Sequence, residues 1–167
     1  MTDQKHTAYI LAGTNMGDRL ELLRKAEKSV AERCGKLVST SSVYETAAWG
    51  FTDQPAFLNQ VWALETPLLP EVLMHDLLEL EQEMGRVRTV KMGPRTIDLD
   101  ILLVNGLIIH SPGLTLPHPA LPQRRFALVP LAEIAPLLLH PVEKKTILQL
   151  LADCTDPLDV QKIYVPD

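Results

Sequence analysis

The chain has 167 residues and a formal net charge of -5, with 46% hydrophobic and 22% charged residues. This length suits one domain over residues 1–167 with a substantial buried core, and the composition is that of an ordinary globular protein. The net negative charge argues against a nucleic-acid-binding protein, which would carry a broad basic face.

The first segment predicts a strand, a turn and a helix. Residues 7–12 are apolar and indicate a buried strand, and residues 13–17 form a glycine-containing turn that ends it. Asp18 suits the N-cap of a helix that Gly35 would end. Such a turn could hold a phosphate at the helix N-terminus. It lacks a Walker lysine and the full G-x-G-x-x-G motif, however, and on its own it favours a structural turn.

Two further strands are predicted, at residues 37–45 and at residues 56–65. The loop between them carries two large aromatic residues, which either cap the core or close over a flat ligand. On the later strand, the two-residue period places Phe57 and Asn59 on one face. An aromatic ring beside a carboxamide suits a flat heterocycle. Spacing alone nevertheless favours a core phenylalanine and a structural asparagine.

A helix is predicted over residues 70–84, with proline in its first turn and glycine directly after it. Leucines at helical spacing form its buried face. Its acidic residues Glu79, Glu81 and Glu83 are expected on the solvated face. His75 has no metal-ligating partner at a useful spacing, so we interpret it as a surface residue.

The stretch from residue 85 to residue 103 is the most informative. It begins with a basic loop around a Gly-Pro breaker, which carries Arg86, Arg88, Lys91 and Arg95. An apolar run follows and predicts a buried strand, on which Asp98 and Asp100 share one face. These two carboxylates would repel each other unless a cation lay between them.

Magnesium suits such a pair of carboxylates, because it binds their oxygens and keeps sites for substrate phosphates. The alternative is a solvated loop followed by Asp–Arg pairs that stabilise the fold. An Asp-x-Asp motif inside an apolar strand, beside a basic glycine-containing loop, favours a site for an anionic ligand.

The C-terminal half predicts three more elements. Asn-Gly at residues 105–106 is typical of a hairpin turn, with residues 107–110 as the partner strand. A helix is expected at residues 146–152 and a short strand at residues 163–165. We find no residues with evident chemistry in the tail from residue 127 onward.

A histidine between two prolines, His118, precedes Arg124, Arg125 and Phe126. The prolines fix the backbone of His118, which would help to aim its imidazole at a phosphate oxygen. A lone histidine is more often structural, but the nearby arginine and aromatic ring favour a functional role. Arg125 is expected to be solvated.

The residues from Lys91 to Leu102, KMGPRTIDLDIL, closely resemble the signature of the 6-hydroxymethyl-7,8-dihydropterin pyrophosphokinase family of folate biosynthesis. The resemblance covers nearly the whole chain. Residues 13–17 are similar to a Gly-Ser-Asn-Leu-Gly run, and residues 117–126 to a Pro-His…Arg-x-Phe pattern. The resemblance implies an α+β fold, a ferredoxin-like sandwich in which an antiparallel sheet is flanked by helices.

The resemblance also implies a reaction: magnesium-dependent transfer of pyrophosphate from ATP to the hydroxymethyl group of the pterin, leaving AMP. The residues implied for catalysis are Arg86, Arg95, Asp98 and Asp100, with Asp98 and Asp100 as ligands of two magnesium ions. Those implied for ATP binding are Arg88, Lys91, Arg95, Ile101, Thr115, His118 and Arg124. Those implied for pterin binding are Thr46, Ala47, Ala48, Trp49, Gly50, Phe57, Asn59 and Phe126. The loops at residues 47–51 and 86–92 are expected to close after ATP binds.

Two other functions remain open. Another magnesium-nucleotide transferase would also use Asp-x-Asp, but it would not need the aromatic and amide residues assigned to the pterin. A non-catalytic binding domain could share the fold, because fold alone does not fix function.

Several further expectations concern location and assembly. No apolar run is long enough to span a membrane, and the N-terminus lacks the apolar core of a signal peptide. We therefore expect a cytoplasmic protein whose cysteines, Cys34 and Cys154, are reduced. No coiled-coil seam calls for an oligomer, so we expect a monomer that binds neither nucleic acid nor membrane.

Overall fold

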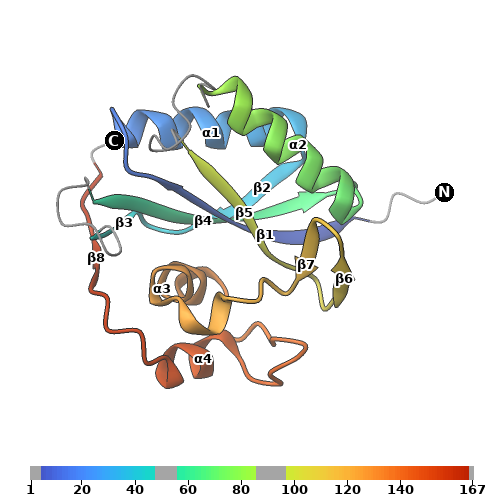
Figure 1. Ribbon diagram of the computed structural model, residues 1–167, viewed down its shortest axis with the longest axis vertical. Helices are drawn as coiled ribbons and strands as arrows, with labels where there is room; N and C mark the ends of the chain where they lie inside the picture. Colours follow the sequence, from blue (N-terminus) through green and yellow to red (C-terminus); the bar gives the residue numbers. More distant parts are fainter. Residues whose placement is uncertain (1–4, 48–55, 86–96, 166–167) are drawn as a thin grey trace.

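The computed structural model describes residues 5–47, 56–85 and 97–165, whose elements form a six-stranded sheet, a two-stranded sheet and helices on both faces of the larger sheet (Figure 1). The strands are β1 His6–Thr14, β2 Lys36–Thr40, β3 Tyr44–Thr46, β4 Phe57–Thr66, β5 Asp98–Val104, β6 Ile109–Ser111, β7 Leu114–Leu116 and β8 Val160–Lys162. The helices are α1 Arg19–Arg33, α2 Pro70–Glu83, the 3₁₀ helix η1 Leu121–Gln123, α3 Arg125–Ile134 and α4 Ile147–Asp153.

The larger sheet has the strand order β5-β1-β4-β3-β8, and β2 also pairs with β4. Its strand pairs are all antiparallel in the described part of the chain. Helices α1 and α2 cover one face of this sheet, and α3 and α4 lie on the other (Figure 1). The predicted ferredoxin-like α+β sandwich is confirmed.

Alternation along the strands divides the buried side chains into two hydrophobic cores. On β1, Ile10 packs in the core beneath α1 and α2, whereas Leu11 packs in the core with α3 and α4. On β5, Leu99 and Ile101 belong to the α1/α2 core. Residues at the alternate positions of these strands therefore face α3, and a site on that face is separated from α1 and α2 by the sheet.

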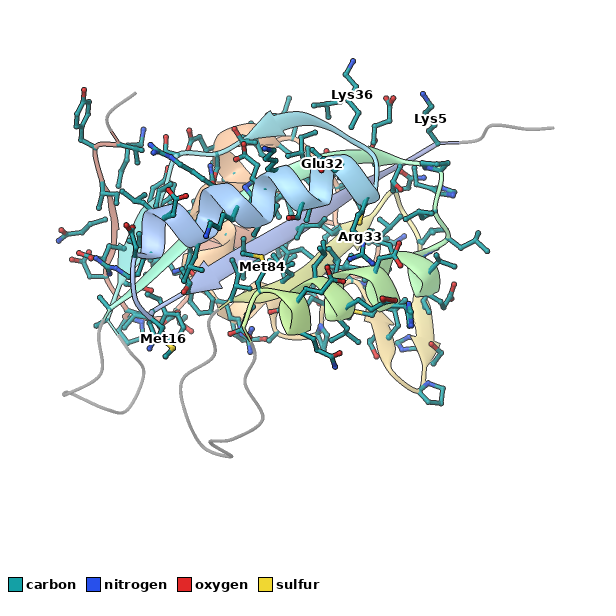
Figure 2. All side chains as sticks on the ribbon, turned by 90° about the horizontal axis from the view of Figure 1, so that it is seen from above. Lys5, Met16, Glu32, Arg33, Lys36 and Met84 are labelled. Carbon is teal, nitrogen blue, oxygen red and sulfur yellow. The ribbon has the colours of Figure 1, made fainter. Side chains whose placement is uncertain are left out.

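Helix α1 forms where the sequence predicts it. The side chain of its N-cap residue, Asp18, accepts a hydrogen bond from the backbone N of Glu21. Arg33, in its last turn, lies between α1 and α2 (Figure 2). There it pairs with Glu83 at 2.7 Å and with Glu79 at 3.5 Å. Surface ion pairs of this kind add little to stability. The packing of α1 and α2 therefore depends mainly on their buried apolar side chains.

The strand predicted at residues 37–45 is instead two strands, β2 and β3. Both pair with β4, but the chain leaves the ladder between them. At the break, the Ser41 side chain accepts a hydrogen bond from Val61 N at 2.9 Å, and its carbonyl accepts one from Gln60 Nε2 at 2.8 Å. Side chains therefore replace part of the regular ladder here, which a run of strand-forming residues does not reveal.

The prediction of a hairpin around residues 105–106 is wrong, because the strand after the turn does not pair with β5. Asn105 does make a turn, with φ at 50°, but its side chain accepts a hydrogen bond from Thr7 N of β1 at 2.8 Å. Strand β6 then pairs with β7 around Gly113. The backbone N of His118 donates a hydrogen bond to the Leu102 carbonyl of β5 at 2.9 Å. The segment that contains His118 therefore lies along the outer edge of β5, where the second strand of the predicted hairpin would have paired.

The predicted C-terminal helix is confirmed, but the strand predicted at residues 163–165 is wrong. Helix α4 begins after Thr146, which makes a capping box with Gln149. The last strand, β8, lies three residues before the predicted one and pairs with β3, and Tyr164 is 87% exposed. Cys34 and Cys154 are free thiols, as expected, and among the described residues no helix is long and apolar enough to cross a membrane.

Candidate active site

A cavity of about 670 Å³ lies between the sheet face that carries α3 and the segment that follows α4. Strands β1, β3, β4 and β5 supply one side, and η1, α3 and residues 155–158 supply the rest. The lining residues are Leu11, Gly13, Thr46, Ala47, Phe57, Asn59, Asp98, Asp100, Ala120, Gln123, Arg124, Phe126, Thr155, Asp156, Pro157 and Leu158. Residues expected to bind a pterin and residues expected to bind metal thus line one cavity.

Strand register explains why these residues meet. Gly13 on β1 lies opposite Asn59 on β4 and opposite Asp98 on β5. Leu11, two residues earlier, lies opposite Asp100. Directly opposed Cα atoms on neighbouring antiparallel strands are about 4.5–5.5 Å apart. An amide, a glycine and a carboxylate therefore cross the sheet in one line beneath the cavity.

Gly13 belongs to β1 and not to the turn in which the sequence placed it, because β1 continues to Thr14. A Cβ atom at this position would lie 2.8 Å from Asn59 Oδ1. Asn59 in turn is only 3% exposed and donates a hydrogen bond from Nδ2 to Thr46 Oγ1 at 3.0 Å. The hydrogen bond to Thr46 holds the Asn59 amide in place. Position 13 must therefore lack a Cβ atom, because that atom would collide with Asn59 Oδ1.

The described residues expected to bind the pterin come together. Phe57 and Asn59 lie on the same face of β4, as the two-residue period predicts, and Phe126 approaches from the first turn of α3. Thr46 and Ala47 line the cavity beside them. The expected residues Ala48, Trp49 and Gly50 lie outside the described part of the chain.

The side of the cavity expected to bind phosphate and metal contains Asp98 and Asp100, both half-buried on β5. Arg124 lines the same cavity, and its Cζ atom lies 5.6 Å from the centre of the Phe126 ring. The expected residues Arg86, Arg88, Lys91 and Arg95 lie outside the described ranges.

His118 has a fixed orientation. Its backbone N–H donates to the Leu102 carbonyl, and its ring Nδ1 accepts a hydrogen bond from Ala120 N at 3.1 Å. Burial lowers the pKa of His118; the nearby Asp100 carboxylate opposes this effect and the Arg124 guanidinium adds to it. A neutral ring whose Nδ1 accepts carries its proton on Nε2, which makes it a hydrogen-bond donor for a phosphate oxygen.

Of the described residues expected near the nucleotide, three are not in the lining of this cavity. The Ile101 side chain is 2% exposed and packs in the core under α1 and α2, on the opposite face of the sheet. Thr115 lies in β7, opposite His110. His118 is the third, although Asp100 and Arg124 are close enough to affect its pKa.

Glu81 corrects the expectation that the acidic residues of α2 are solvated. It is 4% exposed, and its Oε2 accepts a hydrogen bond from Leu99 N at 2.7 Å. Leu99 stands between Asp98 and Asp100, so this carboxylate fixes the backbone that positions both. Helical spacing from Leu77 does place Glu81 on the buried face of α2, but its hydrogen-bond partner lies on another element, which no local pattern indicates.

Replacing Glu81 with alanine is expected to lower the free energy of unfolding by about 1–3 kcal/mol, because the buried Leu99 N–H loses its acceptor. Urea denaturation followed by circular dichroism measures the change. Glu81→Gln is the matched variant: it keeps the size and an acceptor oxygen, so it should lose less. Equal stability of Glu81→Ala and the unchanged chain would contradict the role given to this hydrogen bond.

Arg125 and residues 155–158 also depart from expectation. Arg125 is half-buried and not solvated. Its side chain donates from Nε to the Asp156 carbonyl at 2.9 Å and from Nη2 to the Cys154 carbonyl at 2.8 Å. The tail that showed no chemistry in the sequence therefore lines the cavity, and no local pattern signals this because the partners lie far apart along the chain.

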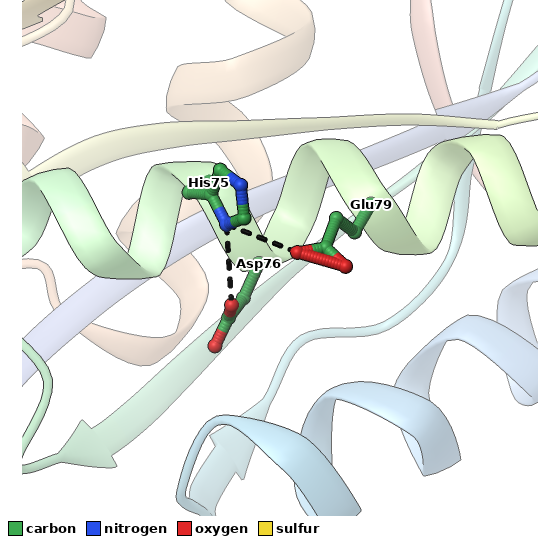
Figure 3. Close-up of side chains that lie close together, drawn as sticks. All are labelled: His75, Asp76 and Glu79. Atoms are coloured by element: carbon green, nitrogen blue, oxygen red, sulfur yellow. Dashed lines mark ion pairs between the residues drawn. The ribbon is translucent and has the colours of Figure 1, made fainter.

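A second group of polar residues lies on α2, on the far side of the sheet from the cavity. His75 Nδ1 lies 3.0 Å from Glu79 Oε1 and 3.7 Å from Asp76 Oδ1 (Figure 3). His75 is on the surface, as expected, but partners at a metal-ligating spacing do exist. Glu79 also pairs with Arg33, so we interpret this group as a set of surface ion pairs.

Comparison with known proteins identifies close relatives of the chain. The family model of 7,8-dihydro-6-hydroxymethylpterin-pyrophosphokinase (HPPK) matches residues 9–136. The chain is 41% identical to the 2-amino-4-hydroxy-6-hydroxymethyldihydropteridine pyrophosphokinase of Aquifex aeolicus, over 84% of this chain and 88% of that protein. It is 40% identical to the Methylorubrum extorquens protein of the same name, over 93% of this chain and 98% of that protein.

Longer proteins contain a similar region. The folic acid synthesis protein fol1 of Pneumocystis carinii is 42% identical over 80% of this chain, but that match spans only 18% of its length. In a crystal structure of a Plasmodium falciparum HPPK-DHPS triple mutant with pterin and p-hydrobenzoate, the similar region has a TM-score of 0.74 at 17% identity. It covers 91% of this chain and 42% of that one, and it shows that the fold is shared.

Proposed function

Because the chain belongs to the 7,8-dihydro-6-hydroxymethylpterin-pyrophosphokinase family, we propose that it transfers the terminal diphosphate of ATP, with magnesium, to 6-hydroxymethyl-7,8-dihydropterin. One observation carries this proposal. Gly13 lies between Asn59 and Asp98 in the sheet, so a ligand that contacts the amide brings its far end close to the carboxylates. That arrangement suits an acceptor with a flat head and a reactive hydroxymethyl group.

The acceptor ring lies between the two phenylalanines. Phe57 and Phe126 approach the cavity from the sheet and from α3, and aromatic side chains bind a flat heterocycle through its faces. Asn59 offers an amide to the ring edge, where it can both donate and accept hydrogen bonds. Thr46 holds that amide, so the edge of the ring is recognised by a group that is already oriented.

Asp98 and Asp100 are the residues that would hold magnesium, and two ions are proposed. Their oxygens are the ligands that magnesium prefers, and both side chains line the cavity from the same face of β5. The metal neutralises phosphate charge and orients the triphosphate when it is bound. Glu81 holds the backbone between the two aspartates, which fixes the strand segment from which both side chains project.

The reaction is an attack of the hydroxymethyl oxygen on the β-phosphorus of ATP. A bond forms between these atoms, the bond from the β-phosphorus to the α–β bridging oxygen breaks, AMP leaves and the hydroxyl proton is lost. Transfers of this kind depend on positioning and charge more than on a protein nucleophile. Arg124 and the Nε2–H of His118 would hold phosphate oxygens, and we propose the same for Arg86, Arg88, Lys91 and Arg95.

Incubation of the protein with magnesium, ATP and 6-hydroxymethyl-7,8-dihydropterin tests the proposal. AMP and the pterin diphosphate should appear in equal amounts, and neither should form without the pterin or with EDTA present. Formation of ADP in place of AMP, or no product at all, would contradict the assigned reaction. Thermal protection by the pterin separates this function from that of another nucleotide transferase.

The pterin is expected to bind after the nucleotide, because loop closure over ATP would complete its pocket. Isothermal titration should show weak pterin binding to the free protein and much tighter binding with a non-hydrolysable magnesium-ATP analogue. Equal affinity in the two titrations would rule out this order.

A further inference from the structure

One wall of the cavity has no part in the roles described so far. It consists of Thr155, Asp156, Pro157 and Leu158, here called the 155–158 wall. These residues connect α4 to β8 and belong to neither a helix nor a strand. Figure 1 shows the connection passing from α4 to the sheet edge at β3 and β8. A segment without regular hydrogen bonds needs other contacts to keep its position beside a ligand.

Arg125 supplies such contacts. Its Nε donates to the Asp156 carbonyl and its Nη2 to the Cys154 carbonyl, at 2.9 and 2.8 Å. Its own backbone N donates to Asp156 Oδ2 at 3.2 Å, and Asp156 Oδ1 accepts from Leu158 N at 3.0 Å. A guanidinium that bonds two separate carbonyls fixes both the distance and the direction of the segment.

Both attachments of the wall lead to parts of the active site. Arg125 is the first residue of α3 and lies between Arg124 and Phe126, which both line the cavity. At the other end, Val160 of β8 pairs with Thr46, which holds the Asn59 amide. The wall is therefore tied to the same elements that present the aromatic ring and the amide.

The chemistry of the wall favours one of the two substrates. It offers one carboxylate, one hydroxyl and two apolar side chains, with no cation among its four residues. Both oxygens of the Asp156 carboxylate already accept backbone hydrogen bonds. The wall offers no cation to a triphosphate, whereas its proline and leucine suit an uncharged ring. The acceptor, and not the nucleotide, is the ligand that this wall fits.

We propose that Arg125 is a positioning residue that holds the 155–158 wall against the pterin and so sets the affinity for the acceptor. This inference rests on the proposed function. Arg125 acts through main-chain carbonyls, so its loss should affect acceptor binding more than the nucleotide or the chemical step.

Steady-state kinetics of Arg125→Ala, with each substrate varied in turn, tests the proposal. The KM for the pterin should rise about ten-fold, as expected for the loss of hydrogen bonds from a charged donor. The kcat and the KM for ATP should stay within about two-fold. Arg125→Lys should give an intermediate KM, because lysine keeps the charge but lacks the planar fork whose Nε and Nη2 reach the two carbonyls. Pterin fluorescence titration with a non-hydrolysable magnesium-ATP analogue gives the same comparison without turnover.

Two further variants complete the experiment. Leu158→Ala removes wall atoms and leaves the Arg125 contacts, so it too should raise the KM for the pterin. Lys145→Ala removes an exposed ion pair to Asp153 of α4 at 2.8 Å, outside the cavity lining, and should leave all constants unchanged. Thermal melts identify any variant that is unfolded at the assay temperature.

The outcomes separate the two proposals. If the unchanged chain is active, and the folded Arg125→Ala and Leu158→Ala variants both keep its KM for the pterin, the proposal for the wall is overturned and the proposed function is not. Equal losses in both KM values and kcat for Arg125→Ala would also overturn it, since they indicate general damage. An unchanged chain that forms no AMP would overturn the proposed function and, with it, the assignment of the wall to the pterin.

Discussion

Replacing Asp98 or Asp100 with alanine is expected to abolish turnover and to leave the fold intact. Both side chains are half-buried and line the cavity from β5. The packing of β5 on the other face comes from Leu99 and Ile101, which are 1% and 2% exposed. Because alternation separates these two sets of side chains, the carboxylates can be removed without disturbing the core.

AMP release in a magnesium-ATP assay measures the loss, and circular dichroism with thermal melting checks the fold. Asp98→Asn and Asp100→Asn keep the size of each side chain and remove its charge, so they should be almost as inactive as the alanine variants. Asp153→Ala is the matched control, because Asp153 is an exposed aspartate paired only with Lys145 among the contacts described above. A near-normal rate in either site variant would refute the metal assignment.

Arg95→Ala is expected to lower kcat by roughly 10²–10³, the usual effect of removing one preorganised charged donor from a transition state. Arg95 lies outside the described residues, and the role proposed for it rests on the motif that also contains Asp98, three positions later. Transfer of a diphosphate spreads negative charge over the phosphate oxygens. A guanidinium that binds these oxygens through two N–H groups stabilises that charge.

Initial rates at saturating ATP and pterin measure the effect. Arg95→Lys should recover part of the rate, because it keeps the charge but loses the planar fork. Arg33→Ala serves as the control: Arg33 pairs with Glu79 and Glu83 and lies between α1 and α2, across the sheet from the cavity. If Arg95→Ala kept its kcat and changed only a KM, a role in binding alone would replace the catalytic one.

The face of each strand could be predicted from the sequence because strand alternation has a fixed period. Phe57 and Asn59, and likewise Asp98 and Asp100, needed only the two-residue repeat to be placed together. The α1 N-cap at Asp18 was predicted as well, since its hydrogen bond joins residues three positions apart. Local geometry was sufficient in each case.

Contacts between distant parts of the chain could not be predicted in this way. Glu81 falls on the buried face of α2 by its spacing from Leu77, but the group that satisfies its carboxylate is the backbone N–H of Leu99, 18 positions further on. Arg125 contacts residues that are 29 and 31 positions away. The Asn-Gly turn at residues 105–106 was predicted correctly as a turn. The pairing of the next strand with β5 was not, because the backbone N–H of His118 donates to the Leu102 carbonyl at that edge. Sequence patterns describe one element at a time and do not report which element meets it.

Gly13 has a consequence for how this pocket can change. Where Gly13 lines the pocket, β1 presents only its backbone, with the Asn59 amide on one neighbouring strand and the Asp98 carboxylate on the other. Depth at that point is set by the sheet itself, and even a methyl group would collide with the Asn59 oxygen. Adaptation to a bulkier or slimmer ligand is therefore expected at the sides, which α3 and the C-terminal connection supply and where a substitution leaves the strand pairing intact.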